Sequence, residues 1–422
     1  MILQLKPFDE NLLSGNAGPA ARFAMELIVK IARIFQAQRL IDISWAHVAS
    51  CYYNARPSLD FAELLARGGA KVRVPTTLTA GSIDLVHPEF QRGDADSAAA
   101  ARRLVALHRS MGCEVTMTCA PYQIGRRPKQ GEHIAWCESS AVVFANSVLG
   151  ACTNRYVEFF DICAAITGRV PDVGLHNREN RRGQVLFRLK DMPQWLLGED
   201  AFYHVLGYLI GREADMRVPV IEGIPRTVSE DQLRALGAAA AAAGPVSMFH
   251  AIGVTPEAAT LEAACHGLSP EQTIDVKPAK LATARAALST PLTRELSAVC
   301  LGSPHFSITE FEKLTPLLEN VRVHPSVKFY VSTNRQVLAE LKERGWLPSY
   351  QRAGVTLVAD TCTYFAPVME GCAGAVMTNS AKWAYYAPGG LGAQVVFASL
   401  EECVRSAAAG KVRCDEKNWL TQ

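Results

Sequence analysis

The sequence predicts an α/β protein whose parallel sheets are covered by helices. Three observations carry this prediction. Short apolar runs such as 355–359 have the length of buried strands and break off at small polar residues. Longer stretches such as 17–37 repeat apolar side chains at helical spacing, and 229–244 is rich in alanine, the best helix former. These strands and helices alternate along the chain, which is typical of sheets with parallel strands.

Length and charge narrow the kind of protein. A chain of 422 residues is too long for one ordinary core and predicts two or three domains. With Lys+Arg at 43 and Asp+Glu at 41, the net charge of +2 is spread evenly, which argues against a nucleic-acid partner. We find no basic leader followed by an apolar segment, and no run of about 18 apolar residues. We therefore expect a cytoplasmic protein that has no membrane contact and binds small molecules or protein.

In the first half, each expected helix has amphipathic spacing or a recognisable cap. The helix at 17–37 has one apolar face, formed by Phe23, Leu27, Ile31 and Ile34. The helix that begins after Ser229 has the cap and the first-turn acids typical of a helix start. In order, we expect helices at 17–37, 60–67, 97–112, 194–212 and 229–244, and strands at 39–44, 71–75, 114–118, 141–145 and 217–225.

The second half continues the same alternation. We expect strands at 296–300, 329–334, 355–359 and 374–377, and helices at 308–318 and 335–345. The stretch 378–382, Thr-Asn-Ser-Ala-Lys, could begin a helix whose free amides face an anion, and its lysine could bind a carboxylate. An exposed helix lysine would explain the same residue.

A weak internal repeat links two places in the chain. Cys119 and Cys362 each follow a predicted strand, and each is followed by a loop and an apolar run that ends in Asn-Ser. The two runs end at Ser147 and Ser380. The match suggests two related α/β halves that face one cleft.

Three of the twelve cysteines lie at predicted strand ends beside small polar residues: Cys119, Cys300 and Cys362. Three thiolates that converge on one cleft could hold iron and leave one position open for a substrate. The alternatives are three unrelated buried thiols, or a metal-free hydrolase in which Cys119 or Cys362 is the nucleophile and His47 or His305 the base. The absence of a CxxC motif argues against a zinc ribbon and a thioredoxin-type pair.

Several spaced segments resemble the large subunit of the aconitase X family, over nearly the whole chain. They are TCAPY at 118–122, ESSAVVFANSVLGACTNR at 138–155, LGSPH at 301–305, ADTC at 359–362 and MTNSAKWAYYAPG at 377–389. The resemblance implies an aconitase-like α/β fold, with multiple α/β/α domains around a central cleft that holds an iron site. We place the domain boundaries near residues 220 and 345, so that 1–220 carries Cys119, 221–345 carries Cys300 and 346–422 carries Cys362.

Members of this family are dehydratases, so the resemblance implies a hydro-lyase. The bacterial branch converts cis-3-hydroxy-L-proline to a pyrroline-2-carboxylate, and the archaeal branch acts on mevalonate 5-phosphate. We expect the first substrate, because a composition rich in alanine and arginine is typical of bacterial proteins. The cofactor implied is a [2Fe-2S] or [4Fe-4S] iron-sulfur cluster, or a single iron.

The family motifs also imply residue roles. The iron ligands correspond to Cys119, Cys300 and Cys362. The catalytic residues correspond to Lys382 and Ser380. The contacts to a small carboxylate substrate correspond to Ser50, Thr79, Glu138, Ser139, Asn379, Ser380 and Lys382.

Two features set this chain apart within the resemblance. In aconitase-like enzymes the base is a serine on a small swivelling domain, and the chain ends at Gln422 without one. We therefore expect a separate small subunit that carries the base serine. Where the family usually reads Gly-Ala-Arg-Thr-Asn-Arg, this chain has Cys152 in place of the first arginine. Loss of that charge could alter carboxylate binding, or Arg155 supplies the charge instead.

Overall fold

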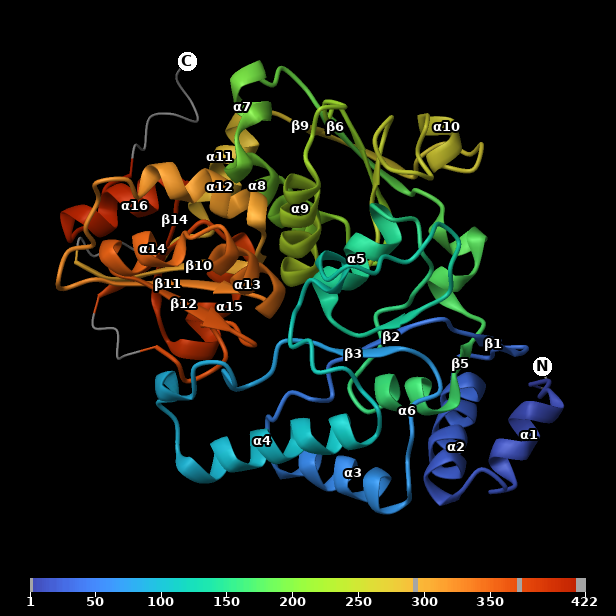
Figure 1. Ribbon diagram of the computed structural model, residues 1–422. Helices are drawn as coiled ribbons and strands as arrows, with labels where there is room; N and C mark the ends of the chain where they lie inside the picture. Colours follow the sequence, from blue (N-terminus) through green and yellow to red (C-terminus); the bar gives the residue numbers. More distant parts are fainter. Residues whose placement is uncertain (1–2, 291–294, 370–373, 415–422) are drawn as a thin grey trace.

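The computed structural model describes residues 3–290, 295–369 and 374–414 of the chain. Three parallel sheets follow one another along the sequence and are covered by helices, as Figure 1 shows. Their strands are short and mostly buried, as expected for parallel sheets with both faces covered. The α/β fold class predicted from the sequence is therefore confirmed. No helix among the described residues is long and apolar enough to cross a membrane.

The first sheet has three parallel strands in the order β3-β2-β4, beside a small antiparallel pair of β1 and β5. The elements of this part are α1 (Pro7–Leu13), α2 (Pro19–Ile34), β1 (Leu40–Asp42), β2 (Ala46–Val48), α3 (Arg56–Arg67), β3 (Thr76–Leu78), α4 (Ala95–Ser110), β4 (Ala135–Trp136), α5 (Ser139–Ser147), α6 (Phe160–Thr167) and β5 (Arg169–Pro171).

The apolar face predicted for α2 is wrong. Phe23 and Ile34 are 36% and 70% exposed, whereas Ala24, Ile28 and Ala32 are fully buried. The small side chains of the buried face allow α2 to pack closely against α6, whose residues are all buried. The buried face of α2 therefore combines small and larger apolar residues, and Leu27 and Ile31 of the predicted face lie at its border, packed against the core.

The second sheet has four parallel strands in the order β8-β7-β6-β9. The helices α8 and α9 pack against each other beside it and contribute to an apolar core that also includes Cys300 of the third sheet. The elements of this part are β6 (Val185–Leu189), α7 (Gln194–Gly198), α8 (Asp200–Glu213), β7 (Pro219–Glu222), α9 (Glu230–Ala243), β8 (His250–Ala251), α10 (Leu261–Ala264), β9 (Gln272–Val276) and α11 (Pro278–Ala286).

The third sheet has five parallel strands in the order β12-β11-β10-β13-β14. Its central strand β10 is longer than expected, because it continues past Cys300 to Phe306. The elements of this part are β10 (Leu296–Phe306), α12 (Ile308–Leu317), β11 (Lys328–Thr333), α13 (Arg335–Glu343), α14 (Leu347–Ala353), β12 (Val355–Ala359), β13 (Ala375–Thr378), α15 (Ala381–Leu391), β14 (Gln394–Phe397) and α16 (Leu400–Ala409).

Three predicted strands in the first part are wrong. Residues 71–75 form no strand, because β3 begins only at Thr76. Residues 141–145 lie inside α5, since a short buried apolar run suits a helix as well as a strand. Residues 114–118 form only an isolated bridge, between Glu114 and Thr77. The predicted repeat therefore matches a helix end at Ser147 with a strand end before Ser380, and it is not a repeat of structure.

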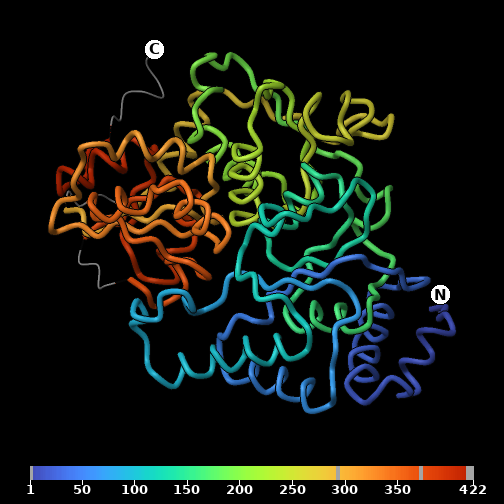
Figure 2. The backbone as a smooth tube through the Cα atoms, in the orientation of Figure 1, coloured from blue at the N-terminus to red at the C-terminus, as the bar shows by residue number. Residues whose placement is uncertain are grey.

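Loops of the first part dock onto the carboxyl edge of the third sheet. The backbone N–H of Gly81 donates to the carbonyl of Asp360 at 2.8 Å, and the carboxylate of Asp84 accepts from the backbone of Ala359 at 2.9 Å. Figure 2 shows the chain of the first part running along the lower edge of the third. This docking brings two strand-end regions about 275 residues apart in sequence into one place.

Candidate metal centre and substrate-binding site

Two cysteines and a histidine converge where the first and third parts meet. One ligand atom each from Cys119, His305 and Cys362 lies within 4.8 Å of the others. Cys119 follows the segment that pairs with β3, His305 lies near the end of β10, and Cys362 follows β12. All three side chains are buried.

The imidazole of His305 is oriented with one nitrogen toward the two sulfur atoms. Its Nε2 lies 3.0 Å from the carbonyl of Thr361, and because a carbonyl only accepts, Nε2 carries the proton. Nδ1 lies 3.3 Å from the hydroxyl of Thr118. Histidines that bind metals commonly donate their other N–H to a backbone carbonyl in this way.

The two thiols share a proton. Burial opposes ionisation of Cys119, but a hydrogen bond from Cys362, together with the charges of His305 and Lys382, outweighs it and lowers the pKa of Cys119 to about 5. The pKa of Cys362 is raised well above its usual range, first by this contact with Cys119 and then by burial. The shared proton is therefore favoured on Cys362, the thiol whose pKa is raised. A bound cation would displace the remaining proton, because metals bind thiolates.

The residues present fit a metal or an iron-sulfur centre. Two thiolates and one imidazole are a soft donor set, which suits iron or zinc rather than magnesium or calcium. Three protein ligands also leave a coordination position open for a substrate.

The structure does not bring Cys300 into this group. It lies in the middle of β10, opposite Tyr330 of β11, and its Sγ is 3.6 Å from the Sδ of Met369. The sequence placed it at a strand end, but the strand continues to Phe306. His305 therefore takes the place that the sequence assigned to Cys300.

A buried ion pair lies beside the metal group. The ammonium of Lys382 contacts the carboxylate of Glu138 at 2.5 Å and the hydroxyl of Ser140 at 3.3 Å. Burial opposes both charges, but the pairing outweighs it, so the pKa of Glu138 is lowered and that of Lys382 is raised well above its usual range. Glu138 also accepts from the backbone of Ala141 at 2.7 Å and caps α5. Lys382 is therefore a fixed cation, and the exposed helix lysine considered above is excluded.

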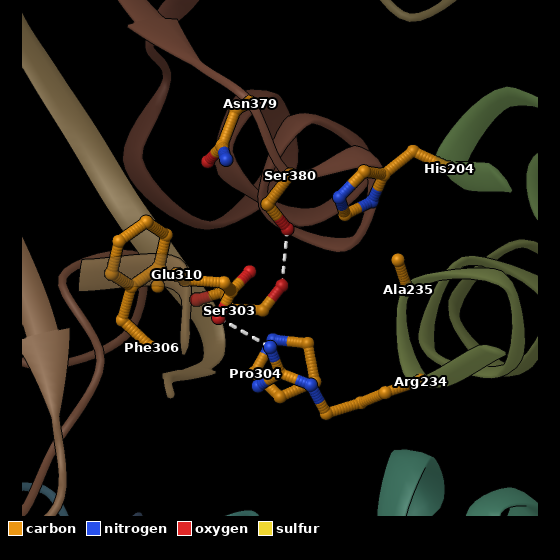
Figure 3. A pocket seen from close by; sticks show the side chains of 10 residues that line it. His204, Arg234, Ala235, Ser303, Pro304, Phe306, Glu310, Asn379 and Ser380 are labelled. Carbon is orange, nitrogen blue, oxygen red and sulfur yellow. Dashed lines mark hydrogen bonds and ion pairs between the residues drawn. The ribbon is translucent and has the colours of Figure 1, made fainter. Parts of the chain in front are cut away.

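Asn379 and Ser380 form the turn between β13 and α15. The hydroxyl of Ser380 caps α15 by accepting from Trp383 at 3.1 Å and donates to the carbonyl of Ser303 (Figure 3). Both residues line a cavity of about 10 Å³, which has room for one water-sized group but not for a substrate. The turn thus holds β10 and the start of α15 in register next to Lys382.

Three further predicted residues lie in the first part of the chain. Ser50 is buried after β2, where its hydroxyl lies 3.3 Å from Nε2 of His108. Thr79 follows β3, and its buried hydroxyl has no hydrogen-bond partner among the described residues. The neighbouring Ala80 packs against Cys119 and Cys362, so the hydroxyl-rich loop does border the metal group. Ser139 is half-buried in the first turn of α5.

The sequence-based reasoning missed or misjudged two members of the site. His305 entered only as a possible hydrolase base, although it follows Gly-Ser-Pro within the LGSPH segment. Ser140, which donates to Glu138 at 2.6 Å, was overlooked because one serine among helix residues carries no signal of its own. Both residues stand inside segments that resemble the family, but the metal-binding and substrate-binding roles were expected at neighbouring residues of the same segments.

The chain is similar to known proteins over nearly its whole length. Family models described as the first, second and third domains of aconitase X match residues 2–179, 183–286 and 296–409. Cis-3-hydroxy-L-proline dehydratase of Pseudomonas aeruginosa is 43% identical, over 99% of this chain and 72% of the relative. The phosphomevalonate dehydratase large subunit of Methanothermobacter thermautotrophicus is 35% identical, over 92% of this chain and 95% of the relative. The crystal structure of Thermococcus kodakaraensis aconitase X in its holo-form superposes with a TM-score of 0.86 at 32% identity, covering 96% of this chain and all of that one.

Proposed function

This chain belongs to the aconitase X family, and we propose that it is a hydro-lyase that dehydrates cis-3-hydroxy-L-proline to a pyrroline-2-carboxylate. Relatives named for this substrate, from Pseudomonas aeruginosa and Hypocrea jecorina, are 43% and 39% identical to the chain. Relatives named phosphomevalonate dehydratase large subunit are 31–35% identical. The higher identity favours the hydroxyproline branch.

The observation that carries the proposal is a soft, three-ligand group beside a buried cation. Cys119, His305 and Cys362 would hold an iron centre, which would supply Lewis acidity to the leaving hydroxyl when bound. The proposal covers a single iron, a [2Fe-2S] and a [4Fe-4S] cluster. Cys300, the ligand first expected, lies inside β10, apart from this group.

Lys382 would bind the carboxylate of the substrate. Its ammonium is held by Glu138 and Ser140, so it is in place before the substrate arrives and loses little side-chain entropy on binding. The high pKa of Lys382 keeps it charged, so it stabilises negative charge and does not act as a base. Asn379 and Ser380 would orient the same end of the substrate, and Ser50, Thr79 and Ser139 would border its other face.

The base would come from another polypeptide. We propose a small partner subunit with a swivelling domain that carries a base serine, as expected from the resemblance. The names of the archaeal relatives, which are large subunits, support a two-chain arrangement. The purified chain alone would then turn over slowly or not at all.

Mevalonate 5-phosphate is a second candidate substrate. The large subunits of phosphomevalonate dehydratase are matched over 93–98% of their length, whereas the two hydroxyproline dehydratases are matched over 72% and 69%. Relatives of both kinds are thus covered over more than two thirds of their length, and identity favours cis-3-hydroxy-L-proline as the substrate.

An assay of both substrates tests the proposal. The chain is purified anaerobically, analysed for iron and acid-labile sulfide, and incubated with each substrate with and without the partner subunit. We expect bound iron and loss of one water from cis-3-hydroxy-L-proline, detected by mass spectrometry, only with the partner present. Turnover that survives iron removal but is abolished by thiol alkylation would instead support a metal-free cysteine hydrolase.

A further inference from the structure

A buried arginine from the second part of the chain reaches the metal group. Arg234 lies in the first turns of α9 and is 3% exposed. It belongs to none of the motifs that carried the sequence analysis. Figure 3 shows it extending from its helix toward the turn around Ser303 and Pro304.

The guanidinium of Arg234 makes contacts on two sides. On one side Nη2 pairs with Glu310 of α12 and lies 3.0 Å from the carboxylate of Asp231. On the other side Nη1 donates to the carbonyl of His305 at 2.6 Å. The two carboxylates compensate the buried charge of the guanidinium. They also fix its orientation, which keeps Nη1 in contact with the carbonyl of His305.

The segment that Arg234 contacts is held from several directions. At Gly302 a Cβ would lie 2.1 Å from the carbonyl of Ser332, so the chain passes very close to β11. Ser380 donates to the carbonyl of Ser303 from the side of α15. At the far end, the backbone N–H of His305 donates to the sulfur of Cys119 at 3.2 Å. Arg234 adds the contact to the His305 carbonyl from the second part of the chain.

We propose that Arg234 is a positioning residue for the metal centre, which fixes the backbone of His305 so that its imidazole stays within reach of the sulfur atoms of Cys119 and Cys362. The inference rests on the proposed function in one respect, namely that these three side chains hold a metal. We assign Arg234 no direct contact with substrate or metal. It acts through the carbonyl of His305, and only a planar fork can contact that carbonyl and two carboxylates at once.

The chain offers a matched control in Arg169. This guanidinium is 1% exposed, pairs with Asp9 and Asp42, and donates to the carbonyl of Leu40 at 3.1 Å. It thus has the same burial and the same kinds of partner as Arg234, but it lies on β5 among residues of the first part. A lysine at either position removes the fork while keeping the charge.

The test uses Co²⁺ as a spectroscopic probe in the metal-free protein. Thiolate and imidazole ligands give Co²⁺ a visible absorption that depends on their geometry, and titration gives a dissociation constant. We expect Arg234→Lys to shift these bands and to raise the dissociation constant about tenfold or more, the usual cost of losing a partner that orients a ligand. Arg169→Lys should leave both unchanged. Wild-type bands and affinity in folded Arg234→Lys would overturn the inference.

Two further variants keep the test decisive. If Arg234→Lys does not fold, Glu310→Gln removes one carboxylate from Arg234 while keeping an acceptor, and it should weaken Co²⁺ binding in the same direction by a smaller factor. An unchanged spectrum and affinity in folded Glu310→Gln would count against the inference. Cys119→Ser and Cys362→Ser should each abolish the thiolate absorption. If the wild type shows no thiolate absorption with Co²⁺, the proposed metal site is wrong. If the wild type shows this absorption and Arg234→Lys has the same bands and dissociation constant, the metal site stands and only the positioning role of Arg234 is wrong.

Discussion

At the scale of single residues, Glu138 shows how one side chain serves both fold and site. Its carboxylate caps α5 through the backbone of Ala141 and holds Lys382, which lies 244 positions further along the chain. Neither charge is stable in this interior by itself, because burial without a partner costs several kcal/mol per ion. The pair therefore depends on both members, and it places a permanent cation next to the metal group.

Replacing Lys382 by methionine separates these two roles. We expect Lys382→Met to lower the free energy of unfolding by about 3 kcal/mol, because the carboxylate of Glu138 is left buried without its partner. The double variant with Glu138→Gln should recover most of this loss, since no charge stays unpaired. Activity should stay low in both variants, because the cation for the substrate carboxylate is gone. Urea denaturation and kcat/KM measure the two effects.

An exposed pair provides the control for this experiment. Arg22 and Glu26 form an i,i+4 pair on α2 with side chains 57% and 39% exposed. Arg22→Met should change the free energy of unfolding by less than about 1 kcal/mol, as is usual for exposed ion pairs. If Lys382→Met lowered the free energy of unfolding no more than Arg22→Met does, the buried pair of Lys382 and Glu138 would stabilise the fold no more than an exposed pair.

At the scale of elements, the packing of α8 on α9 decides where Arg234 lies. A Cβ on Gly207 would approach the carbonyl of Leu236 to 2.2 Å, and one on Gly211 would approach that of Ala240 to 2.6 Å. The two helices therefore meet through backbone, which requires glycine at both positions. These two residues thus set the separation between α8 and α9. Because Arg234 lies on α9, this separation also affects how far its side chain reaches toward His305.

Gly207→Ala should disturb this contact. The added methyl group would force the helices apart, and we expect a loss of about 1–3 kcal/mol in the free energy of unfolding, as for other overpacked sites. Gly198→Ala in α7 is the control, since a Cβ there would meet nothing within 4 Å. Equal unfolding midpoints for the two variants in urea would contradict the close contact of α8 and α9.

At the scale of the whole molecule, several histidines are buried in the neutral form. Burial is the main cause that lowers the pKa of His47, His108 and His204 to about 4 and that of His176 to about 3. In the unfolded chain the same side chains have a pKa near 6.5. Each therefore takes up a proton when the protein unfolds in mild acid.

This difference predicts acid sensitivity. Because the folded-state pKa values lie below the unfolded value, the contribution of each histidine to stability is fully present above about pH 6.5 and is lost as the pH falls toward 4. Each contributes a slope of about 1.4 kcal/mol per pH unit within that window. Denaturation curves between pH 7 and pH 5 measure the total slope.

Removing one histidine should reduce this slope by one proton. His108 is suitable, because it is 1% exposed and its Nδ1 donates to the carbonyl of Leu104 at 2.9 Å. We expect His108→Gln to lower overall stability yet to lessen its dependence on pH near pH 5.5. An unchanged slope would mean that His108 is already protonated in the folded protein.

Much of the fold of this protein could be predicted from short stretches of its sequence. The α/β class and most elements of the third sheet rest on short apolar runs and capped helices, whose patterns depend on near neighbours. Cys119 and Cys362, each expected after a strand, do lie close together in the structure, because small polar residues after a strand collect at one sheet edge.

Only the tertiary structure decided which of these residues meet. The sequence predicts that β10 ends at Cys300. In the structure its pairing with β13 stops at Val299, but its pairing with β11 continues to Leu301 and resumes at Phe306, so His305 and not Cys300 lies near the end of the strand. Lys382 is likewise buried as an ion-pair partner of Glu138, which lies 244 positions away in the sequence. Strand length, burial and charge pairing depend on contacts between distant parts of the chain, and a local pattern carries no information about them.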